Sequence, residues 1–447
     1  MNKLYAGYAA TVITPPMGIG ISGYFKDRFA SGVLDDLYAR AVALRAGEDT
    51  VVLIAVDICL IETPDFRRAL EQISADNGLP MDHIFMTCTH THTSPFVNAT
   101  RTEAIDKAYP DYFNRRVSDA VKFAIADLKP AKLGWAVGKA ENVAFVRRFR
   151  MKDGSCRTNP GVGNPDVVHP IGDVDERLNV VRIDRENAET IVISNFANHP
   201  DTIGGDLISA DWPGLSCVAL ERAIPGVKAL FLNGTQGDVN HININAKGGD
   251  LNNMFHDFDD VHRGYAHAKH IANVVAGGIM SVYEKVNYID VDEIRCKQEL
   301  VPVPANKATA EELVQAHIYK KLHEEGHDDQ IPFEGMELTT VVAEALRMVK
   351  LAAAPDTFDL LLSSVAVGDL AFIGIPGEPF TGIGRGLKEN KSFDLVLPCC
   401  ITNGYEGYFP MQDSYDEGGY EARSSRYKAG TAELIIEEGK ALLDTLR

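Results

Sequence analysis

Short apolar runs bounded by turn residues recur along this chain of 447 residues, and their alternation with longer segments limits the folds available to it. Their length and β-branched content are typical of strands. We expect strands at 39–44, 51–56, 84–86, 133–137, 180–183, 191–196, 229–232, 360–365, 370–375 and 395–397. Amphipathic segments predict helices at 63–77, 111–128, 212–223, 260–286, 310–325, 338–352 and 431–446. Strands that alternate with helices indicate an α/β protein, with a mixed β-sheet core covered by helices.

Residues 297–332 fit this alternation least well, because they are charged and contain a Val-Pro-Val-Pro sequence. We expect a helical insertion here, at about 297–357. The candidate site residues described below come from both ends of the chain. They therefore favour a single domain over residues 1–447.

The composition argues against several classes of function. Apolar residues make up 45% of the chain and charged residues 24%, which is ordinary for a globular protein. The formal net charge is −19, which argues against nucleic acid as a partner, because nucleic acid attracts basic surfaces. No apolar stretch is long enough to cross a membrane, so stable membrane insertion is not expected. A small molecule is the expected partner.

The cysteines and the N-terminus indicate a reducing compartment. Seven cysteines without a repeating pattern do not suggest a disulfide framework. The opening residues, Met-Asn-Lys-Leu-Tyr-Ala-Gly-Tyr, lack the apolar segment of a secretion signal. We therefore expect a cytoplasmic protein.

A histidine pair follows the expected strand at 84–86, in the sequence Thr-Cys-Thr-His-Thr-His-Thr-Ser-Pro. His90 and His92 are two residues apart, so on a strand both imidazoles lie on the same face. By themselves they fit surface polar residues, a structural pair or two members of a metal site.

Three further strands run into polar residues. The expected strand at 191–196 leads to His199, the one at 229–232 to Asp238 or His241, and the one at 370–375 to Glu378. Strand ends are where α/β proteins gather their sites. The pattern is typical of a metal hydrolase, in which a few protein ligands leave one position open.

Two other motifs have simpler interpretations. Gly18-Ile19-Gly20-Ile21-Ser22-Gly23 matches a dinucleotide-binding pattern but lacks its strand–turn–helix context, so a glycine-rich turn near a pocket is favoured. Residues 256–270 contain His256, His262, His267 and His270. They fit a second metal site less well than a solvated helix start.

Five motifs, taken in order, resemble the neutral/alkaline (non-lysosomal) ceramidase family. They are THTHTSP at 89–95, NHPDTIGGDLISADWPG at 198–214, NGTQGDVNH at 233–241, PGEPFT at 376–381, and NGYEGY at 403–408 followed by YEA at 420–422. The resemblance implies one zinc ion, Zn²⁺, held by His90, His199, Glu378 and Tyr408. It also implies catalytic roles for His92, Tyr420 and an arginine, which is Arg147 or its neighbour Arg148.

The chain departs from the family in three places. Ser94 stands where the family has glycine, and Gly234 or Thr235 stands where it has serine. The chain also ends soon after the YEA motif, so the resemblance covers the catalytic domain and not the family's C-terminal immunoglobulin-like domain. These departures leave the metal chemistry in place but point away from ceramide itself.

The resemblance implies a zinc-dependent hydrolase that cleaves the amide bond of an N-acyl compound with metal-activated water, and the departures favour a soluble substrate over ceramide. Arg147 and Tyr420 would stabilise the oxyanion. His92 would move a proton, a role suited to its ordinary pKa of about 6.5. Asp57 and Asp238 would orient ligand imidazoles or cap loops. The alternatives are an esterase or lactonase on the same scaffold, or a non-catalytic metal-binding protein.

Overall fold

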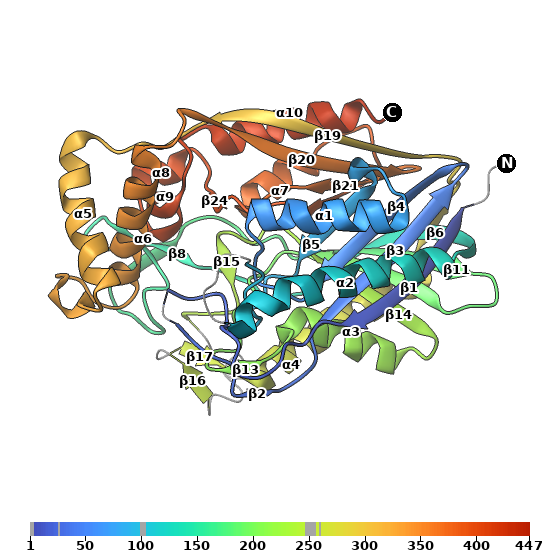
Figure 1. Cartoon of the computed structure of the whole chain (residues 1–447), viewed down its shortest axis with the longest axis horizontal. Coiled ribbons are helices and arrows are strands. Elements are labelled where there is room, and N and C mark those ends of the chain that lie inside the picture. Colours follow the sequence, from blue (N-terminus) through green and yellow to red (C-terminus); the bar gives the residue numbers. More distant parts are fainter. Residues whose placement is uncertain (1–3, 26, 99–103, 246–255, 259–260) are drawn as a thin grey trace.

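Two β-sheets lie at the centre of the computed structural model, which describes residues 4–25, 27–98, 104–245, 256–258 and 261–447 (Figure 1). Parallel and antiparallel pairs both occur in each sheet. The larger sheet has the order β14 (Val227–Asn233), β12 (Thr190–Phe196), β11 (Arg177–Arg185), β6 (Lys129–Lys139), β1 (Tyr5–Val12), β3 (Tyr38–Ala46), β4 (Asp49–Val56) and β5 (Ile84–Cys88), with β18 (Asn287–Ile289) also beside β6. The smaller sheet has the order β19 (Ile294–Pro304), β20 (Thr357–Val367), β21 (Leu370–Gly374) and β23 (Leu395–Cys399).

The two sheets pack face to face, and this explains why β4 is apolar throughout. Val51 and Leu53 join a core that also contains Phe372 of the smaller sheet. Val52 and Ile54 point the other way, into a core shared with the covering helices. A strand that is buried on both faces has no polar side, so it reads as a continuous apolar run.

Helices cover the outer faces of both sheets (Figure 1). The larger sheet is covered by α1 (Thr63–Asn77) and α2 (Ala104–Ala126) over one part, and by α3 (Asp211–Ala223) and α4 (Tyr265–Val282) over another. The smaller sheet is covered by α7 (Thr381–Leu387) and α10 (Thr431–Asp444). The predicted mixed α/β architecture is therefore confirmed.

The predicted boundaries differ most from the structure in three places. The helix expected at 260–286 begins at Tyr265, because residues before it form the hairpin β16 (His256–Phe258) and β17 (Val261–Arg263); residues 259–260 lie outside the described chain. The helix expected from residue 111 begins at Ala104 and contains Pro110. Residues 297–304, expected to open an insertion, belong to β19, which is an edge strand and so tolerates Pro302.

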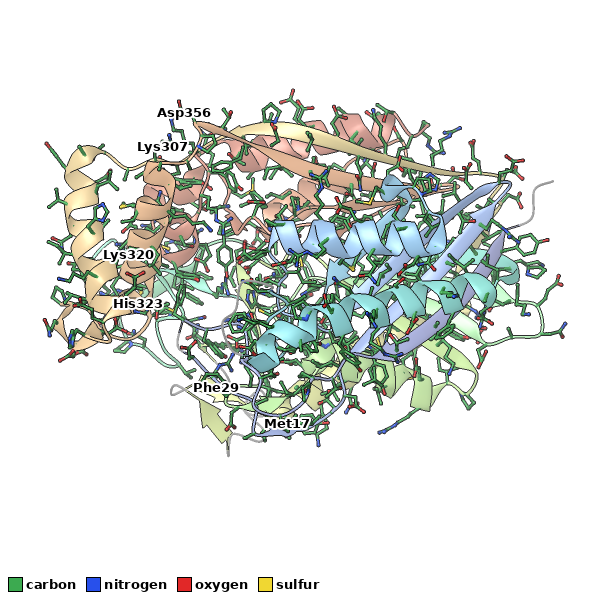
Figure 2. All side chains as sticks on the ribbon, viewed as in Figure 1. Met17, Phe29, Lys307, Lys320, His323 and Asp356 are labelled. Carbon is green, nitrogen blue, oxygen red and sulfur yellow. The ribbon has the colours of Figure 1, made fainter. Side chains whose placement is uncertain are left out.

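A helical pair formed by α5 (Ala310–Glu324) and α6 (Gly335–Ala352) projects from the end of the smaller sheet (Figure 1). An ion pair of 2.7 Å between Lys307 and Asp356 joins the two points where the chain leaves and rejoins the sheet (Figure 2). A capping box at Thr309 and Glu312 starts α5. Both helices lie within the range of the expected insertion, about 297–357, and the insertion itself stays a prediction. The single-domain organisation stays a prediction.

Short strand pairs arrange the loops near the candidate site. They are β2 (Gly32–Val33) with β13 (Leu207–Ile208), β7 (Phe145–Val146) with β15 (Val239–Asn240), β22 (Glu378–Pro379) with β24 (Tyr408–Phe409), and β8 (Arg148–Met151) between β9 (Cys156–Thr158) and β10 (Val167–Pro170). Two short helices, α8 (Asp413–Glu417) and α9 (Tyr420–Ser424), follow β24. None of the helices in the described part of the chain is long and apolar enough to cross a membrane.

Candidate metal centre

His90 lies two residues beyond β5 in an unusual backbone conformation. Its φ angle is 74°, in the left-handed region that non-glycine residues seldom adopt. Its backbone N–H donates to the carbonyl of Ile58 at 2.9 Å. Its ring Nδ1 lies 2.7 Å from the carbonyl oxygen of Cys59, which accepts a hydrogen bond from it. These bonds aim Nε2 into the interior, between the strand ends.

Two other loops bring a histidine and a carboxylate to the same point. His199 follows β12, and the carbonyl of the next residue, Pro200, accepts a bond from the backbone N–H of His92 at 3.2 Å. Glu378 opens β22, which pairs in parallel with β24, so that Glu378 lies beside Tyr408. Asp238 secures this loop, because it accepts from the backbone N–H of Thr381 at 2.7 Å and from its hydroxyl at 3.0 Å.

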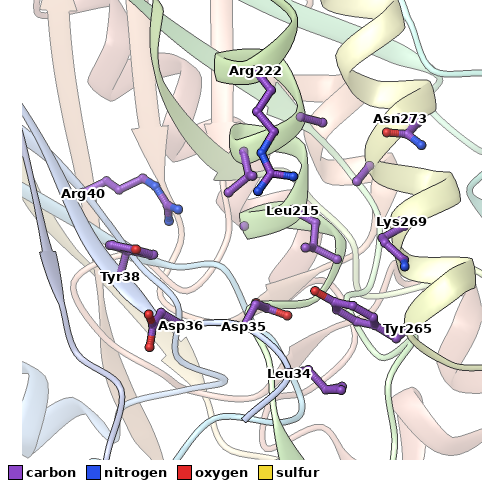
Figure 3. Close-up of a pocket in the computed structure, with 14 residues that line it drawn as sticks. Leu34, Asp35, Asp36, Tyr38, Arg40, Leu215, Arg222, Tyr265, Lys269 and Asn273 are labelled. Atoms are coloured by element: carbon purple, nitrogen blue, oxygen red, sulfur yellow. The ribbon is translucent and has the colours of Figure 1, made fainter.

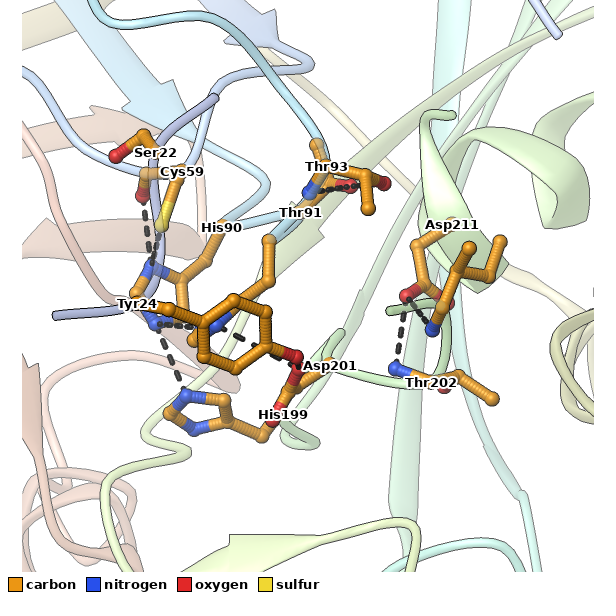
Figure 4. A network of polar contacts seen from close by, with 12 residues as sticks. Ser22, Tyr24, Cys59, His90, Thr91, Thr93, His199, Asp201, Thr202 and Asp211 are labelled. Carbon is orange, nitrogen blue, oxygen red and sulfur yellow. Dashed lines mark hydrogen bonds and ion pairs between the residues drawn. The ribbon is translucent and has the colours of Figure 1, made fainter. Parts of the chain in front are cut away.

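Three ligand atoms converge at distances that suit one metal ion. His90 Nε2 is 3.1 Å from His199 Nε2 (Figure 4). Glu378 Oε2 lies 3.3 Å from His90 Nε2 and 3.8 Å from His199 Nε2. Zinc–nitrogen bonds of about 2.0–2.1 Å place the ligands of a tetrahedral site roughly 3.3 Å apart. All three side chains are buried, and Glu378 Oε2 makes no hydrogen bond within the described residues. The donor set therefore fits a divalent metal.

The charges of these groups are strongly coupled. Burial opposes a charge on His90, but the Glu378 carboxylate outweighs burial and raises the pKa of His90 well above its ordinary value. Burial likewise opposes the charge on Glu378, but His90 and Arg147 lower its pKa to about 2. Burial, and then the Arg147 guanidinium, hold the pKa of His199 well below its usual range. Glu378 and Arg147 thus have opposite effects on the charges of the two histidines.

His92 lies at the edge of the three-ligand cluster. Its Nε2 is 3.3 Å from His90 Nε2, and its Nδ1 is 3.6 Å from Asp201 Oδ1. The expected ordinary pKa of His92 was wrong. Burial lowers the pKa of His92 to about 3, although the Asp201 carboxylate acts in the opposite direction. The sequence could not show how completely this ring is removed from water.

The two neighbouring arginines point to different places. Arg147 Nη1 lies 3.4 Å from His199 Nδ1, and its other nitrogens donate to Glu421 Oε1 and the carbonyl of Gly237, both at 2.7 Å. Arg148 instead donates to the hydroxyl of Ser414 at 2.9 Å and to the carboxylate of Glu417 at 3.0 Å. Only Arg147 of the two faces the cluster.

Three tyrosines surround the cluster on the side of the C-terminal motifs. The ring of Tyr408 lies 5.6 Å from that of Tyr420 and 5.5 Å from the guanidinium of Arg147. Tyr405 donates from its hydroxyl to Glu378 Oε1 at 2.8 Å. Burial, and then the charge of Glu378, raise the pKa of Tyr408 well above its ordinary value, so a phenolate there needs a nearby dication.

Comparisons with known proteins show what this chain resembles. No family model matches the chain. The chain is similar to the neutral ceramidase of Mycobacterium tuberculosis (strain ATCC 25618 / H37Rv), with 23% identity over 469 residues that cover 91% of this chain and 71% of the relative. It superposes on the crystal structure of neutral ceramidase from Pseudomonas aeruginosa with a TM-score of 0.72 and 18% identity, over 100% of this chain and 75% of that one. The chain has the fold of a neutral ceramidase catalytic domain. A ceramidase complexed with C2 gives a TM-score of 0.71 at 17% identity, over 100% of this chain and 76% of that one.

The resemblance predicted from five motifs is thus confirmed: the curated relative supports a ceramidase-like hydrolase, and the solved structures share the fold. The structure brings His90, His199 and Glu378 together as one group of potential metal ligands. His92, Arg147, Tyr408 and Tyr420 border that group. Their catalytic and metal-binding roles stay predictions.

Two residues of this ceramidase-like domain have other surroundings than expected. Asp57 forms an ion pair with Arg40 at 2.8 Å and accepts from the Thr89 hydroxyl at 3.3 Å, so it supports the loop and does not contact a ligand imidazole. The hydroxyl of Ser94 accepts from the backbone N–H of Cys59 at 2.7 Å. The serine that replaces the family glycine therefore helps to hold the loop that carries His90.

Several residues near the site were missed in the sequence. Glu421 binds Arg147, and Tyr405 binds Glu378; both stand inside quoted motifs, so the motifs carried a signal for them. Asp201 and Tyr24 lie near His92, and no local pattern connects them. For the histidines at 256–270, no potential metal cluster in the described part of the chain includes His267 or His270, whose rings stack 6.0 Å apart.

A cavity of about 370 Å³ lies apart from the ligand cluster, and none of the candidate ligands lines it (Figure 3). One of its lining residues, Asp35, accepts from the hydroxyl of Ser209 at 2.6 Å and from the backbone N–H of Ala210 at 2.8 Å. The carbonyl of Ser209 in turn accepts from the Thr91 hydroxyl at 2.7 Å. Asp35 therefore helps to hold the loop that carries His90 and His92.

Proposed function

We propose that this protein is a zinc-dependent hydrolase that cleaves the amide bond of an N-acyl compound. The main support is that His90 Nε2, His199 Nε2 and Glu378 Oε2 lie within 3.8 Å of one another. Glu378 Oε2 is also buried and makes no hydrogen bond within the described residues. Tyr408, beside Glu378 on the paired strand, is the proposed fourth ligand.

A bound zinc ion would supply a Lewis acid that polarises a carbonyl and lowers the pKa of water towards about 7. The surrounding residues complete the reaction. Arg147 is held by Glu421 and the Gly237 carbonyl, so its guanidinium is oriented before a substrate arrives. Together with Tyr420 it is proposed to stabilise the oxyanion formed from the substrate carbonyl.

His92 is proposed to accept a proton at Nε2 from the attacking water and to pass it to the leaving nitrogen. Its low pKa keeps the ring neutral at neutral pH, so a lone pair is present to accept the proton, but it also makes the imidazole a weak base. The same low pKa of His92 favours a second candidate function, the hydrolysis of an ester or lactone. An alkoxide can leave without being protonated more readily than an amine can. A histidine that does not donate a proton therefore slows ester cleavage less than it slows amide cleavage.

A soluble substrate is supported by a second cavity, of about 180 Å³, which Tyr420 lines. Most of its other lining residues are polar, among them Thr158, Asn159, Glu334 and Glu337. Such a lining suits a small hydrophilic group better than a long acyl chain, because polar groups lose their water when an apolar chain covers them.

The test is a substrate panel with purified protein, first stripped of metal and then loaded with zinc. The panel contains short-chain N-acyl amides, matched esters and lactones, and a short-chain ceramide. Amide cleavage that depends on zinc and is lost in Glu378→Gln supports the proposal. Cleavage of esters or lactones alone would replace it with the second candidate. Silence on every substrate from a zinc-loaded protein would favour a non-catalytic metal-binding protein.

A further inference from the structure

The glycine-rich stretch Gly18–Gly23 lies against His92. Gly23 has a φ angle of 110°, and a Cβ atom placed on it would lie 3.0 Å from the Cα, Cβ and Cγ atoms of His92. Only glycine permits both that backbone conformation and that approach. The stretch that resembled a nucleotide-binding pattern is therefore part of the wall that holds this histidine.

The residues that follow the glycines tie the same wall to the backbone of His92. Arg28 donates to the carbonyl oxygens of His92 at 2.8 Å and of Ser22 at 2.6 Å. Its guanidinium also lies 4.1 Å from the centre of the Tyr24 ring. The Tyr24 ring contacts the imidazole of His92 edge to face, with 5.5 Å between centroids. His92 is thus restrained from the side opposite the ligand cluster.

A carboxylate completes this arrangement. Asp201 stands two residues after His199, where its Oδ1 accepts a hydrogen bond from the Tyr24 hydroxyl and lies 3.6 Å from His92 Nδ1 (Figure 4). His92 Nδ1 is buried and makes no hydrogen bond within the described residues. A separation of 3.6 Å is slightly too long for a hydrogen bond, but such contacts commonly tighten when substrate binds.

We infer that Asp201 is a positioning residue, which accepts a hydrogen bond from Nδ1–H of His92 and thereby keeps the unprotonated Nε2 directed at the reacting atoms. A histidine can act at Nε2 only if that nitrogen carries its lone pair, and the partner of Nδ1 decides which tautomer is present. Tyr24 holds the carboxylate in place. The inference rests on the proposed function, since it assigns a role within that reaction.

The experiment is a double-mutant cycle with zinc-loaded enzyme and the substrate that the panel identifies. The variants are Asp201→Asn, Asp201→Glu, His92→Ala and the double variant His92→Ala with Asp201→Asn. Asp206→Asn, an exposed carboxylate on the same loop, is the matched control. The kcat, the KM, the zinc content and the unfolding temperature are measured for each.

We expect Asp201→Asn to lower kcat by about 10- to 100-fold with little change in KM, as for other partners that orient an imidazole. Asp201→Glu, which keeps the carboxylate, should recover much of the loss. In the His92→Ala background Asp201→Asn should have no further effect, because Asp201 acts through the ring that has been removed.

Equal effects of Asp201→Asn in both backgrounds would overturn the inference, and so would a loss of zinc or of folding that accounts for the lower activity. An unchanged kcat in Asp201→Asn would also overturn it. These results differ from failure of the proposed function, in which the wild-type protein itself cleaves nothing or holds no zinc.

Discussion

The Nε2 atoms of His90 and His199 face each other at a distance of 3.1 Å. The Nδ1 atom of His90 lies 2.7 Å from the Cys59 carbonyl, and that of His199 lies 3.5 Å from the Gln236 carbonyl. A carbonyl only accepts, so a neutral His90 carries its lone pair on Nε2, and His199 does so in the tautomer that donates from Nδ1 to the Gln236 carbonyl. A cation between the two Nε2 atoms would satisfy both lone pairs and replace the proton that Glu378 otherwise favours on His90.

Removing the carboxylate should release the metal. We expect Glu378→Gln to retain less than about a tenth of the zinc of the wild type, because a neutral amide is a much weaker ligand for the ion. Zinc content is measured by elemental analysis after dialysis against a weak chelator. Glu417→Gln, which changes a carboxylate that pairs with Arg148 away from the cluster, serves as the control. Equal zinc in both variants would contradict the proposed ligand set.

The two adjacent arginines should separate activity from stability. Arg147→Lys is expected to lower kcat by about 100-fold, because lysine cannot reproduce the fork that binds Glu421 and faces the cluster. Arg148→Lys should leave kcat nearly unchanged and lower the free energy of unfolding by about 1–2 kcal/mol through its lost bonds to Ser414 and Glu417. Kinetics and urea unfolding measure the two effects. A larger loss of kcat in Arg148→Lys would reverse the assignment.

Two tyrosines near Glu378 should differ in their effect on zinc. Tyr408 is the proposed ligand, so Tyr408→Phe should weaken zinc binding by at least about tenfold. Tyr405→Phe removes the hydrogen bond to Glu378 Oε1 but leaves every proposed ligand, so its effect should be smaller. Competition with a coloured chelator measures both affinities. The opposite ranking would make Tyr405 the ligand, and equal affinities in all three proteins would remove both from the site.

Asp211 should make stability depend on pH. Its Oδ2 accepts from the backbone N–H groups of Thr202 and Ile203, yet burial outweighs these bonds and raises its pKa to about 7. In the unfolded chain the pKa of aspartate is about 3.9. The folded protein therefore binds more protons between about pH 4 and 7, and its free energy of unfolding should fall as pH rises through that window.

Asp211→Asn removes this titration, so its stability should vary less with pH than that of the wild type across the same window. Urea unfolding at several pH values measures the difference between the two proteins. If the free energy of unfolding varied with pH in the same way in both proteins, folding would not raise the pKa of Asp211.

The parts of the site that follow from short-range patterns were predictable. His90, His199 and Glu378 each stand just beyond an apolar strand, and strand length and turn chemistry are local properties of the sequence. The family motifs added Tyr408 and Tyr420, which nothing in their local pattern distinguishes from ordinary turn residues.

The parts that depend on distant segments were not predictable. Tyr24 and Asp201 are 177 residues apart in the chain, and only the folded loops bring them together beside His92. The low pKa of His92 arises from burial, which no spacing reveals. The strand β19 was not predicted, because prolines argue against a strand unless it lies at the edge of a sheet, and the sequence does not show that β19 lies there.

The central claim is that His90, His199 and Glu378 hold one zinc ion. Its most direct test is a crystal structure of the zinc-loaded protein with anomalous diffraction data collected on both sides of the zinc absorption edge. We predict one zinc-specific peak, about 2.0–2.2 Å from His90 Nε2, His199 Nε2 and an oxygen of Glu378. A peak bound elsewhere, or none between these three side chains, would contradict the claim.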